Sequence, residues 1–384
     1  MCLIFSSCIN SKDIAENQLA KFDLKASPQT VNVRLSELGF RDIEYIPLET
    51  TDQSVIQGIY KIIPAGEFYL LYVYDRILSF CSDGSFNVQI GKSGRGPDEF
   101  LVIHDLDFDD RKQQIYIVDG WNGKFYVFSE RGDLIRMFSS PIHGPLEFKI
   151  SGSRILCYVR NDSGNTLNSY YLIDTIGGLV KKFPNRFTFD GNIGTFAYLN
   201  ENLFYRFKRQ LFKKEIYSDT VYSFDGLNFR PHLIFDVGQR LLTPAAHSEF
   251  NGEYLSENYI TPRNLFEFGD YVYYEYLYEN KFEPTDLVYG FIGSKEKDFH
   301  AFINSGQGIY NDLDGGPDIW PKTTRDDNTI LTWIDAIYLK KHVASEAFRK
   351  SKPLYPEKKQ ELEKLANSLK ETDNPVLVLV RHNK

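Results

Sequence analysis

The sequence contains no run of eighteen or more apolar residues, so it predicts no membrane-spanning helix. It also lacks an excess of positive charge, because 52 acidic residues outnumber 44 basic ones and leave a formal net charge of −8. A chain without a positive field does not neutralise phosphates, which argues against nucleic-acid binding. Its 7 histidines show no paired spacing of metal ligands, and no serine lies in a nucleophile elbow. Local motifs therefore identify no enzyme class.

Cysteine is scarce as well, and of the 4 cysteines only Cys81 and Cys157 lie within the segment expected to fold. Two cysteines do not form a disulfide framework for a domain of this size. Neither has the partner set of a zinc site or a thiol nucleophile nearby in the sequence. We expect two buried free thiols.

Aromatic residues are abundant, with 30 Phe and 25 Tyr, and one aromatic-rich phrase recurs. Residues 76–86 align without a gap on residues 124–134, an offset of 48 residues. Each copy has an apolar strand, a polar turn closed by Gly and a second strand. Looser copies contain Leu172, Phe224 and Phe291. A period of this length with several strands per unit is typical of β-propeller blades.

A sixth unit is harder to recognise, because it is divided between the two ends of the chain. Residues 336–371 have a helical composition, and an apolar strand follows at residues 376–380. We predict that this strand pairs with residues 43–48 and closes the ring, since an open propeller leaves exposed strand edges. The predicted fold is an all-β, six-bladed β-propeller over residues 39–384, with a helical insertion near the C-terminus.

The N-terminus resembles the end of a bacterial lipoprotein signal. Residues 1–8 form a short apolar stretch with small residues before Cys8, and a polar segment follows. In this interpretation Cys8 carries the lipid and residues 9–38 are a tether. The chain would then meet a membrane through a lipid anchor alone.

Two further phrases carry a family resemblance. Residues 90–100 resemble a Gly-rich "G-x-G-P-x-E-aromatic" connector, and residues 311–321 resemble an "N-D-x-x-G-G…W-P" segment. Together with the ending at residues 371–379, they are similar to a family of six-bladed, NHL-like β-propeller lipoproteins of Bacteroidetes-type bacteria. The resemblance covers roughly residues 40–384. It implies a secreted or surface lipoprotein and carries over no catalytic residues.

The Gly-rich phrase also contains Gly91-Lys92-Ser93, the end of a phosphate-binding loop motif. However, Phe86 stands where that motif needs Gly, and no helix is expected to follow. We expect a turn between two blades that needs glycine backbone angles.

Alternating carboxylates in residues 105–110 form a first candidate site. Asp105 and Asp107 would lie on one strand face, which suits a metal such as Ca²⁺, a channel lining or simply solvent. A calcium loop is not completed, because Asp110 and Tyr116 stand where it needs Gly and Glu. The solvated polar face is the simpler interpretation.

Two basic stretches, residues 207–209 and 212–214, are likewise interpreted as solvated.

A second candidate site surrounds the Gly315-Gly316 turn. Asp312 and Asp314 are candidate metal ligands, and with Asp318 and Trp320 they are candidate ligand-binding residues. Short carboxylate spacing on a turn can direct several oxygens at one cation. Asx-type hydrogen bonding explains the same carboxylates without a metal. Trp320 would stack on a sugar or peptide, or pack between blades.

These observations give three hypotheses for function. The first is a lipid-anchored, non-catalytic module of the cell envelope, on the periplasmic or surface face of the outer membrane, that binds a protein, glycan or peptide at the mouth of its channel. The alternative is a metal-assisted propeller hydrolase or lyase with its site in the channel. The third is a structural subunit of an envelope complex.

Overall fold

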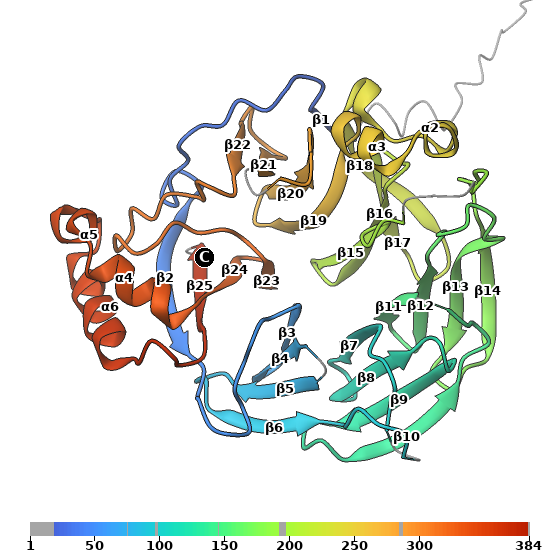
Figure 1. The fold of residues 1–384 in the computed structure, drawn as a ribbon, viewed down its shortest axis with the longest axis horizontal. Coiled ribbons are helices and arrows are strands. Elements are labelled where there is room, and N and C mark those ends of the chain that lie inside the picture. Colours follow the sequence, from blue (N-terminus) through green and yellow to red (C-terminus); the bar gives the residue numbers. More distant parts are fainter. Residues whose placement is uncertain are drawn as a thin grey trace, which may run out of the picture.

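The computed structural model describes residues 19–74, 76–96, 99–144, 146–191, 197–283 and 287–382. In this part of the chain six β-sheets surround a central axis as the blades of a β-propeller (Figure 1). The predicted fold class is confirmed. None of the helices in these ranges is long and apolar enough to cross a membrane.

Blades one to three each use four consecutive antiparallel strands, the first of them innermost. Blade one contains β3 (Lys61–Ala65), β4 (Phe68–Val73), β5 (Arg76–Cys81) and β6 (Phe86–Ile90). Blade two contains β7 (Asp105–Asp109), β8 (Gln114–Asp119), β9 (Lys124–Ser129) and β10 (Leu134–Ser139). Blade three contains β11 (Leu146–Ser151), β12 (Arg154–Val159), β13 (Asn168–Asp174) and β14 (Leu179–Pro184). The two aligned phrases of the sequence are thus the outer hairpins of blades one and two.

Blades four and five follow the same order. Blade four contains β15 (Asn202–Phe207), β16 (Gln210–Glu215), β17 (Thr220–Phe224) and β18 (Phe229–Asp236). Blade five contains β19 (Thr261–Phe268), β20 (Tyr271–Leu277), β21 (Val288–Ser294) and β22 (His300–Asn304).

Blade six joins the two ends of the chain. Its inner strands are β23 (Thr323–Asp326), β24 (Thr329–Ile334) and β25 (Val376–His382), and its outermost strand is β2 (Phe40–Pro47). In the antiparallel register Ile43 lies opposite Val380, and Pro47 lies opposite Val376. This is the closing pair that the sequence predicts.

The N-terminal segment corrects the expected tether. Residues 20–38 belong to the folded body, because β1 (Ala20–Asp23) pairs in parallel with β18 as a fifth strand of blade four. The segment then bridges to blade five at Thr30 and Phe302, and it buries Leu35 completely. Residues 1–18, with Cys8, lie outside the described residues.

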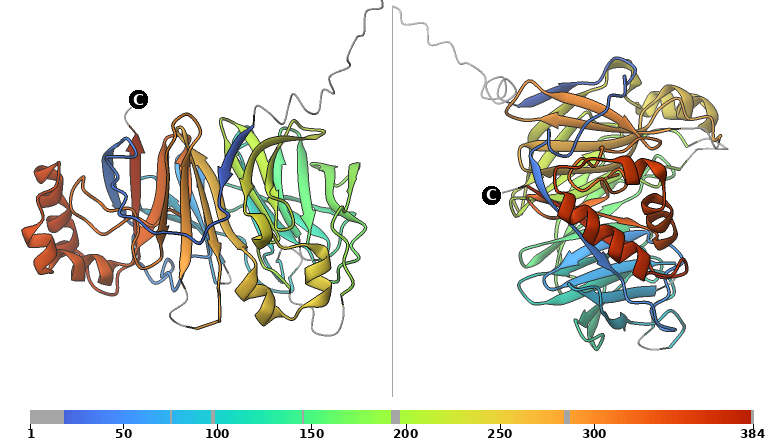
Figure 2. Two further views of the ribbon diagram at one scale, coloured as in Figure 1. Left: turned by 90° about the horizontal axis from the view of Figure 1, so that it is seen from above. Right: turned by 90° about the vertical axis from the view of Figure 1, so that its left-hand side faces the viewer.

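The propeller has two different ends. The turns between the first and second strands of each blade, and between the third and fourth, lie at one end, which we name the turn face. Connections between blades and the turns between the second and third strands lie at the other end. The helices α2 (Pro244–Glu249) and α3 (Gly252–Asn258) lie there too, and we name this end the helical face (Figure 2). Figure 1 looks onto the helical face.

Two groups of helices pack against the ring of blades. The expected insertion contains α4 (Ala336–Val343), α5 (Glu346–Lys350) and α6 (Pro356–Ser368), which flank the outer side of blade six. The pair α2 and α3 and the short 3₁₀ helix η1 (Gly238–Arg240) are not among the elements predicted from the sequence. Thr243 and Asn251 cap α2 and α3 by accepting backbone N–H bonds, a local signal that the sequence does contain.

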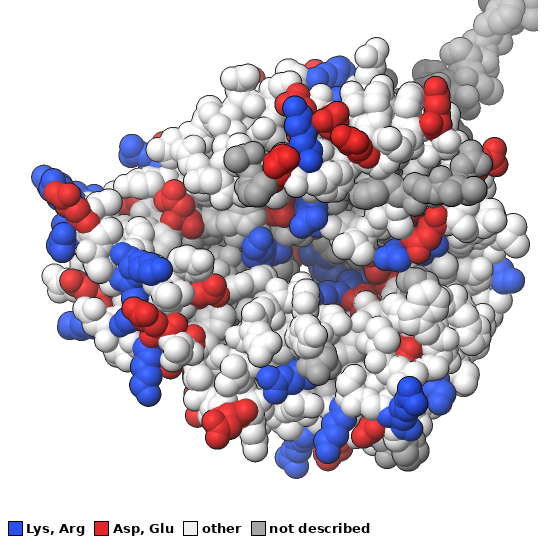
Figure 3. Space-filling model, viewed as in Figure 1, with Lys and Arg blue, Asp and Glu red and all other residues white. Residues whose placement is uncertain are grey.

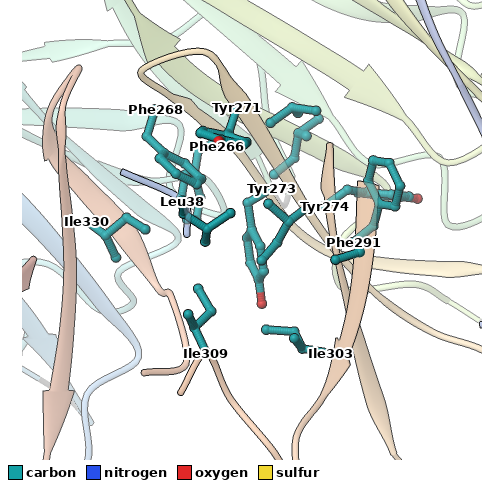
Figure 4. Close-up of a cluster of buried hydrophobic side chains, with 14 of the residues drawn as sticks. Leu38, Phe266, Phe268, Tyr271, Tyr273, Tyr274, Phe291, Ile303, Ile309 and Ile330 are labelled. Carbon is teal, nitrogen blue, oxygen red and sulfur yellow. The ribbon is translucent and has the colours of Figure 1, made fainter. Parts of the chain in front are cut away.

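The largest buried cluster spans blades four, five and six. Figure 4 shows Leu38 from the N-terminal segment among Phe266, Phe268 and Tyr273 of blade five, with Ile330 of blade six beside them. The N-terminal segment therefore supplies part of the core and does not simply run over its surface.

Candidate functional site

The central channel is lined by the inner strands, and a network of ion pairs connects blades one to four there. Figure 3 shows Lys and Arg side chains inside the central hollow. Strand β7 presents Asp105, Asp107 and Asp109 on one face, as its alternating sequence predicts, but none of the three is more than 5% exposed. The predicted solvated face is therefore wrong. The carboxylates face the inner strands of the neighbouring blades.

Asp105 is neutralised by two lysines from the adjacent blades. Lys61 of β3 pairs with one carboxylate oxygen, and Lys149 of β11 lies 3.3 Å from the other. Burial alone would raise the pKa of Asp105, but Lys149 and Lys61 outweigh it and lower the pKa to about 2. The carboxylate thus stays ionised and links three blades.

Asp107 is held by an arginine two blades away. Arg206 of β15 donates to both carboxylate oxygens, at 3.0 and 2.6 Å, and the Ile150 N–H donates to one of them at 2.7 Å. Burial opposes ionisation, but Arg206 lowers the pKa of Asp107. The ammonium and guanidinium groups lie where a metal would have to bind these carboxylates. Within the described ranges no three His, Cys, Asp or Glu side chains are grouped to hold a metal.

The second candidate site does not converge on one point. Asp312 accepts hydrogen bonds from the backbone N–H and the hydroxyl of Ser36. Asp314 is fully buried and accepts from Asn311 Nδ2 at 2.7 Å and from the Gly316 N–H at 2.9 Å, while Asp318 is exposed. Burial raises the pKa of Asp314. Asp312 and Asp314 therefore have separate partners, and the buried Oδ2 of Asp314 has no hydrogen-bond partner.

Trp320 packs between blades. Its ring meets the edge of Tyr273 at 6.3 Å between centroids, and its backbone carbonyl accepts from the Thr332 hydroxyl at 2.8 Å. The side chain is half-buried against the large core cluster. This geometry suits the packing interpretation.

The Gly-rich phrase is the connector between blades one and two, as expected. Glu99 accepts from the Gly96 N–H at 2.7 Å, and Phe100 is completely buried. A side chain at Gly91 would meet the Phe100 ring at 2.7 Å, and Gly91 has a φ of +64°. The motif residues are thus explained by the shape of the turn.

Two basic residues differ from the sequence prediction. Lys213 and Lys214 are 5% and 3% exposed, although the sequence predicts a solvated face. Lys213 pairs with Glu215 and lies over the rings of Tyr170 and Tyr222 at 4.8 and 4.7 Å. Aromatic faces and one carboxylate replace the water that a buried ammonium loses.

Cys157 is a buried free thiol, as expected, and Cys81 is free but half-buried.

Exposed apolar side chains gather at the helical face. Large ones on its connections are Tyr60, Tyr74, Leu101, Val102, Trp121, Leu167, Leu199 and Tyr254. In the described turns of the turn face, Ile176 and Leu227 are the large hydrophobic side chains that are exposed. No local pattern predicts this asymmetry, because a propeller must close before its two faces exist.

Trp121 is the largest of these side chains and is 62% exposed. It lies on a turn that Asp119, itself fully buried, holds by accepting from Asn122 Nδ2 at 2.7 Å and from the Leu101 N–H at 3.0 Å. The Gly120 N–H donates to His104 at 3.1 Å, and the His104 ring meets the indole edge at 5.7 Å. The tryptophan is therefore presented from a fixed backbone.

Comparisons with known proteins agree on the fold. A family model described as "Domain of unknown function (DUF4934)" matches residues 19–381. The structure of a putative exported protein from Bacteroides fragilis is 16% identical, with a TM-score of 0.70, covering 95% of this chain and 100% of that one. A duf4221 family member from Bacteroides vulgatus is 11% identical, with a TM-score of 0.53, covering 89% of this chain and 96% of that one. No curated protein matches the chain.

Proposed function

The chain belongs to the DUF4934 family, and we propose that it is a non-catalytic binding module of the cell envelope that holds a protein partner on its helical face. The observation that carries this proposal is the unequal distribution of large exposed apolar side chains between the two faces. Such side chains gathered on one surface mark interaction sites, whereas scattered ones need no explanation.

The Trp121 turn is the proposed centre of this surface. Tryptophan is enriched among the residues that dominate binding energy. Because Asp119 and His104 already fix the turn, little conformational entropy is lost when a partner covers the indole. Leu101 and Val102 extend the apolar area, at 49% and 42% exposed.

Crosslinking in cells tests this proposal. We expect a photoreactive residue at Trp121 to yield a protein adduct of discrete mass, and one at Leu227 on the turn face to yield none. Leu227 is a suitable control because it is also exposed, at 45%. Sedimentation of the purified chain separates a partner from self-association. Equal crosslinking from both positions, or none from Trp121, would contradict the proposal.

The proposed lipid anchor fixes which face points outward. Strand β1 begins at the turn face, since it runs parallel to β18, which leads from a turn-face hairpin to the helical face. Cys8 precedes Leu19 by eleven residues, which span at most about 40 Å. A lipid on Cys8 would therefore hold the turn face toward the membrane and leave the helical face free. The description of the Bacteroides fragilis neighbour as exported supports an envelope location.

Mass spectrometry of the mature N-terminus tests the anchor. We expect a diacylated or triacylated Cys8 as the first residue of membrane-extracted protein, and release into the soluble fraction for Cys8→Ala. An intact N-terminus with a free Cys8 would overturn the anchor and leave the binding proposal unaffected.

A further inference from the structure

The channel contains a hollow of about 290 Å³ near the turn face. The inner strands of all six blades line it, namely β3, β7, β11, β15, β19 and β23. Its volume equals that of about ten water molecules, which is the size of an amino acid or a monosaccharide.

Arg209 is exposed and lines this hollow from a strained turn. Lys208 and Arg209 form the two-residue loop between β15 and β16, with φ values of 49° and 61°. Asn-Gly is the favoured pair in such a turn, because other side chains raise the energy of a positive φ. Arg209 also lines an adjoining hollow of about 800 Å³. Backbone strain at a cationic residue suggests that its position serves a function.

The guanidinium groups here have unused donors. Arg206 is paired with Asp107, but Arg209 forms no ion pair with any carboxylate in the part of the chain that the structure describes. Arg325 donates from Nη2 to the Gly66 carbonyl at 3.0 Å and lies over the Tyr69 ring at 4.8 Å, and its buried Nη1 has no hydrogen-bond partner. A buried donor without an acceptor usually indicates a bound water or ligand.

Two carboxylates near the hollow already accept hydrogen bonds. Asp326 accepts from the Asn328 N–H at 2.9 Å and from the Thr329 hydroxyl at 3.0 Å. Asp327 accepts from the Lys208 N–H at 2.7 Å. Asp110 also lines the hollow but is exposed, so the arginines are the lining groups able to bind an anion.

The rest of the lining is half polar and half apolar. Thr323 and Thr324 offer hydroxyl groups, and the half-buried Phe204 offers ring surface. Hydroxyl groups match the first set, and the C–H face of a sugar ring matches the second.

We propose that this hollow binds a small carboxylate that also carries hydroxyl groups, and that Arg209 contacts the carboxylate. An acidic monosaccharide is the class of ligand that would use the arginines, the neutral polar groups and the aromatic ring surface together. The site lies at the face opposite to the proposed partner surface. If no ligand binds in the hollow, the proposed partner surface on the helical face is therefore unaffected.

Calorimetric titration of the full chain with D-glucuronate, D-glucose and inorganic phosphate tests the proposal. We expect glucuronate to bind at least tenfold more tightly than either of the others, because glucose lacks the charge and phosphate lacks the ring. Arg209→Gly should weaken glucuronate binding at least tenfold. It should also leave the melting temperature equal or higher, since glycine relieves the positive φ.

Arg131→Ala is the matched control, since Arg131 is an exposed arginine on an outer turn-face hairpin away from the hollow. We expect it to bind glucuronate as the natural chain does. Equal binding of glucose, unchanged binding by Arg209→Gly, or the absence of binding at millimolar glucuronate would overturn the proposal.

Discussion

Glu201 shows how burial controls a single ionisable residue. It is 1% exposed, and one carboxylate oxygen accepts from the Tyr158 hydroxyl at 3.0 Å and from the Asn161 N–H at 2.6 Å. The other oxygen has no partner. Burial raises the pKa of Glu201 to about 7.

This raised pKa predicts a pH dependence of stability. Glu201 keeps its proton up to a higher pH in the native state than in the unfolded state. The free energy of unfolding therefore falls as the pH rises from about 4.5 to about 7. Glu201→Gln cannot ionise and should gain about 1–3 kcal/mol relative to the natural chain between pH 5 and pH 8. Urea unfolding at both pH values measures this gain. Glu371→Gln, at an exposed position, should show none, and a parallel pH dependence in both variants would contradict the expected pKa.

The channel residues show the limit of sequence-based reasoning at this scale. The alternation in residues 105–109 correctly places Asp105 and Asp107 on one face of a strand. Their partners Lys61, Lys149 and Arg206 come from three other blades, so their pairing depends on a ring that no local pattern describes. The same limit explains why the sequence predicts a solvated Lys213, since the rings around it belong to other strands.

At the scale of elements, β1 is the strand that no sequence pattern predicts. Four residues with few apolar side chains give little periodicity, and the parallel partner β18 lies far along the chain. Phe22 nevertheless is 8% exposed and packs on Phe235 and Phe291, with ring centroids 5.8 and 5.4 Å away. The outer hairpins of blades one to five were predictable, because each is a local, repeated unit.

Phe22→Ala measures what β1 contributes. Removing a buried ring should lower the free energy of unfolding by about 2–4 kcal/mol. Lys21→Ala in the same strand removes only a surface ion pair with Asp236 and should cost less than about 1 kcal/mol. Denaturant unfolding compares the two. Equal, small effects would mean that residues 20–23 act as the tether that the sequence predicts.

At the scale of the whole molecule, the ion pairs and the closing strand hold different parts of the ring. Lys61, Asp105, Lys149, Asp107 and Arg206 connect blades one to four through the channel. The N-terminal segment connects blades four, five and six around the outside. Every boundary between neighbouring blades is thus crossed by one of these two links, except the boundary between blades six and one.

The pairing of β2 with β25 also sets the order of events during synthesis. Pro47 leaves the ribosome before the strands of blades one to five, but its partner Val376 is made only after all of them. The ring therefore cannot close on a nascent chain, and blade six remains open until β25 has been made. A chain of this design stays incompletely folded while its other five blades are synthesised, so its last strand controls when the ring becomes a closed body.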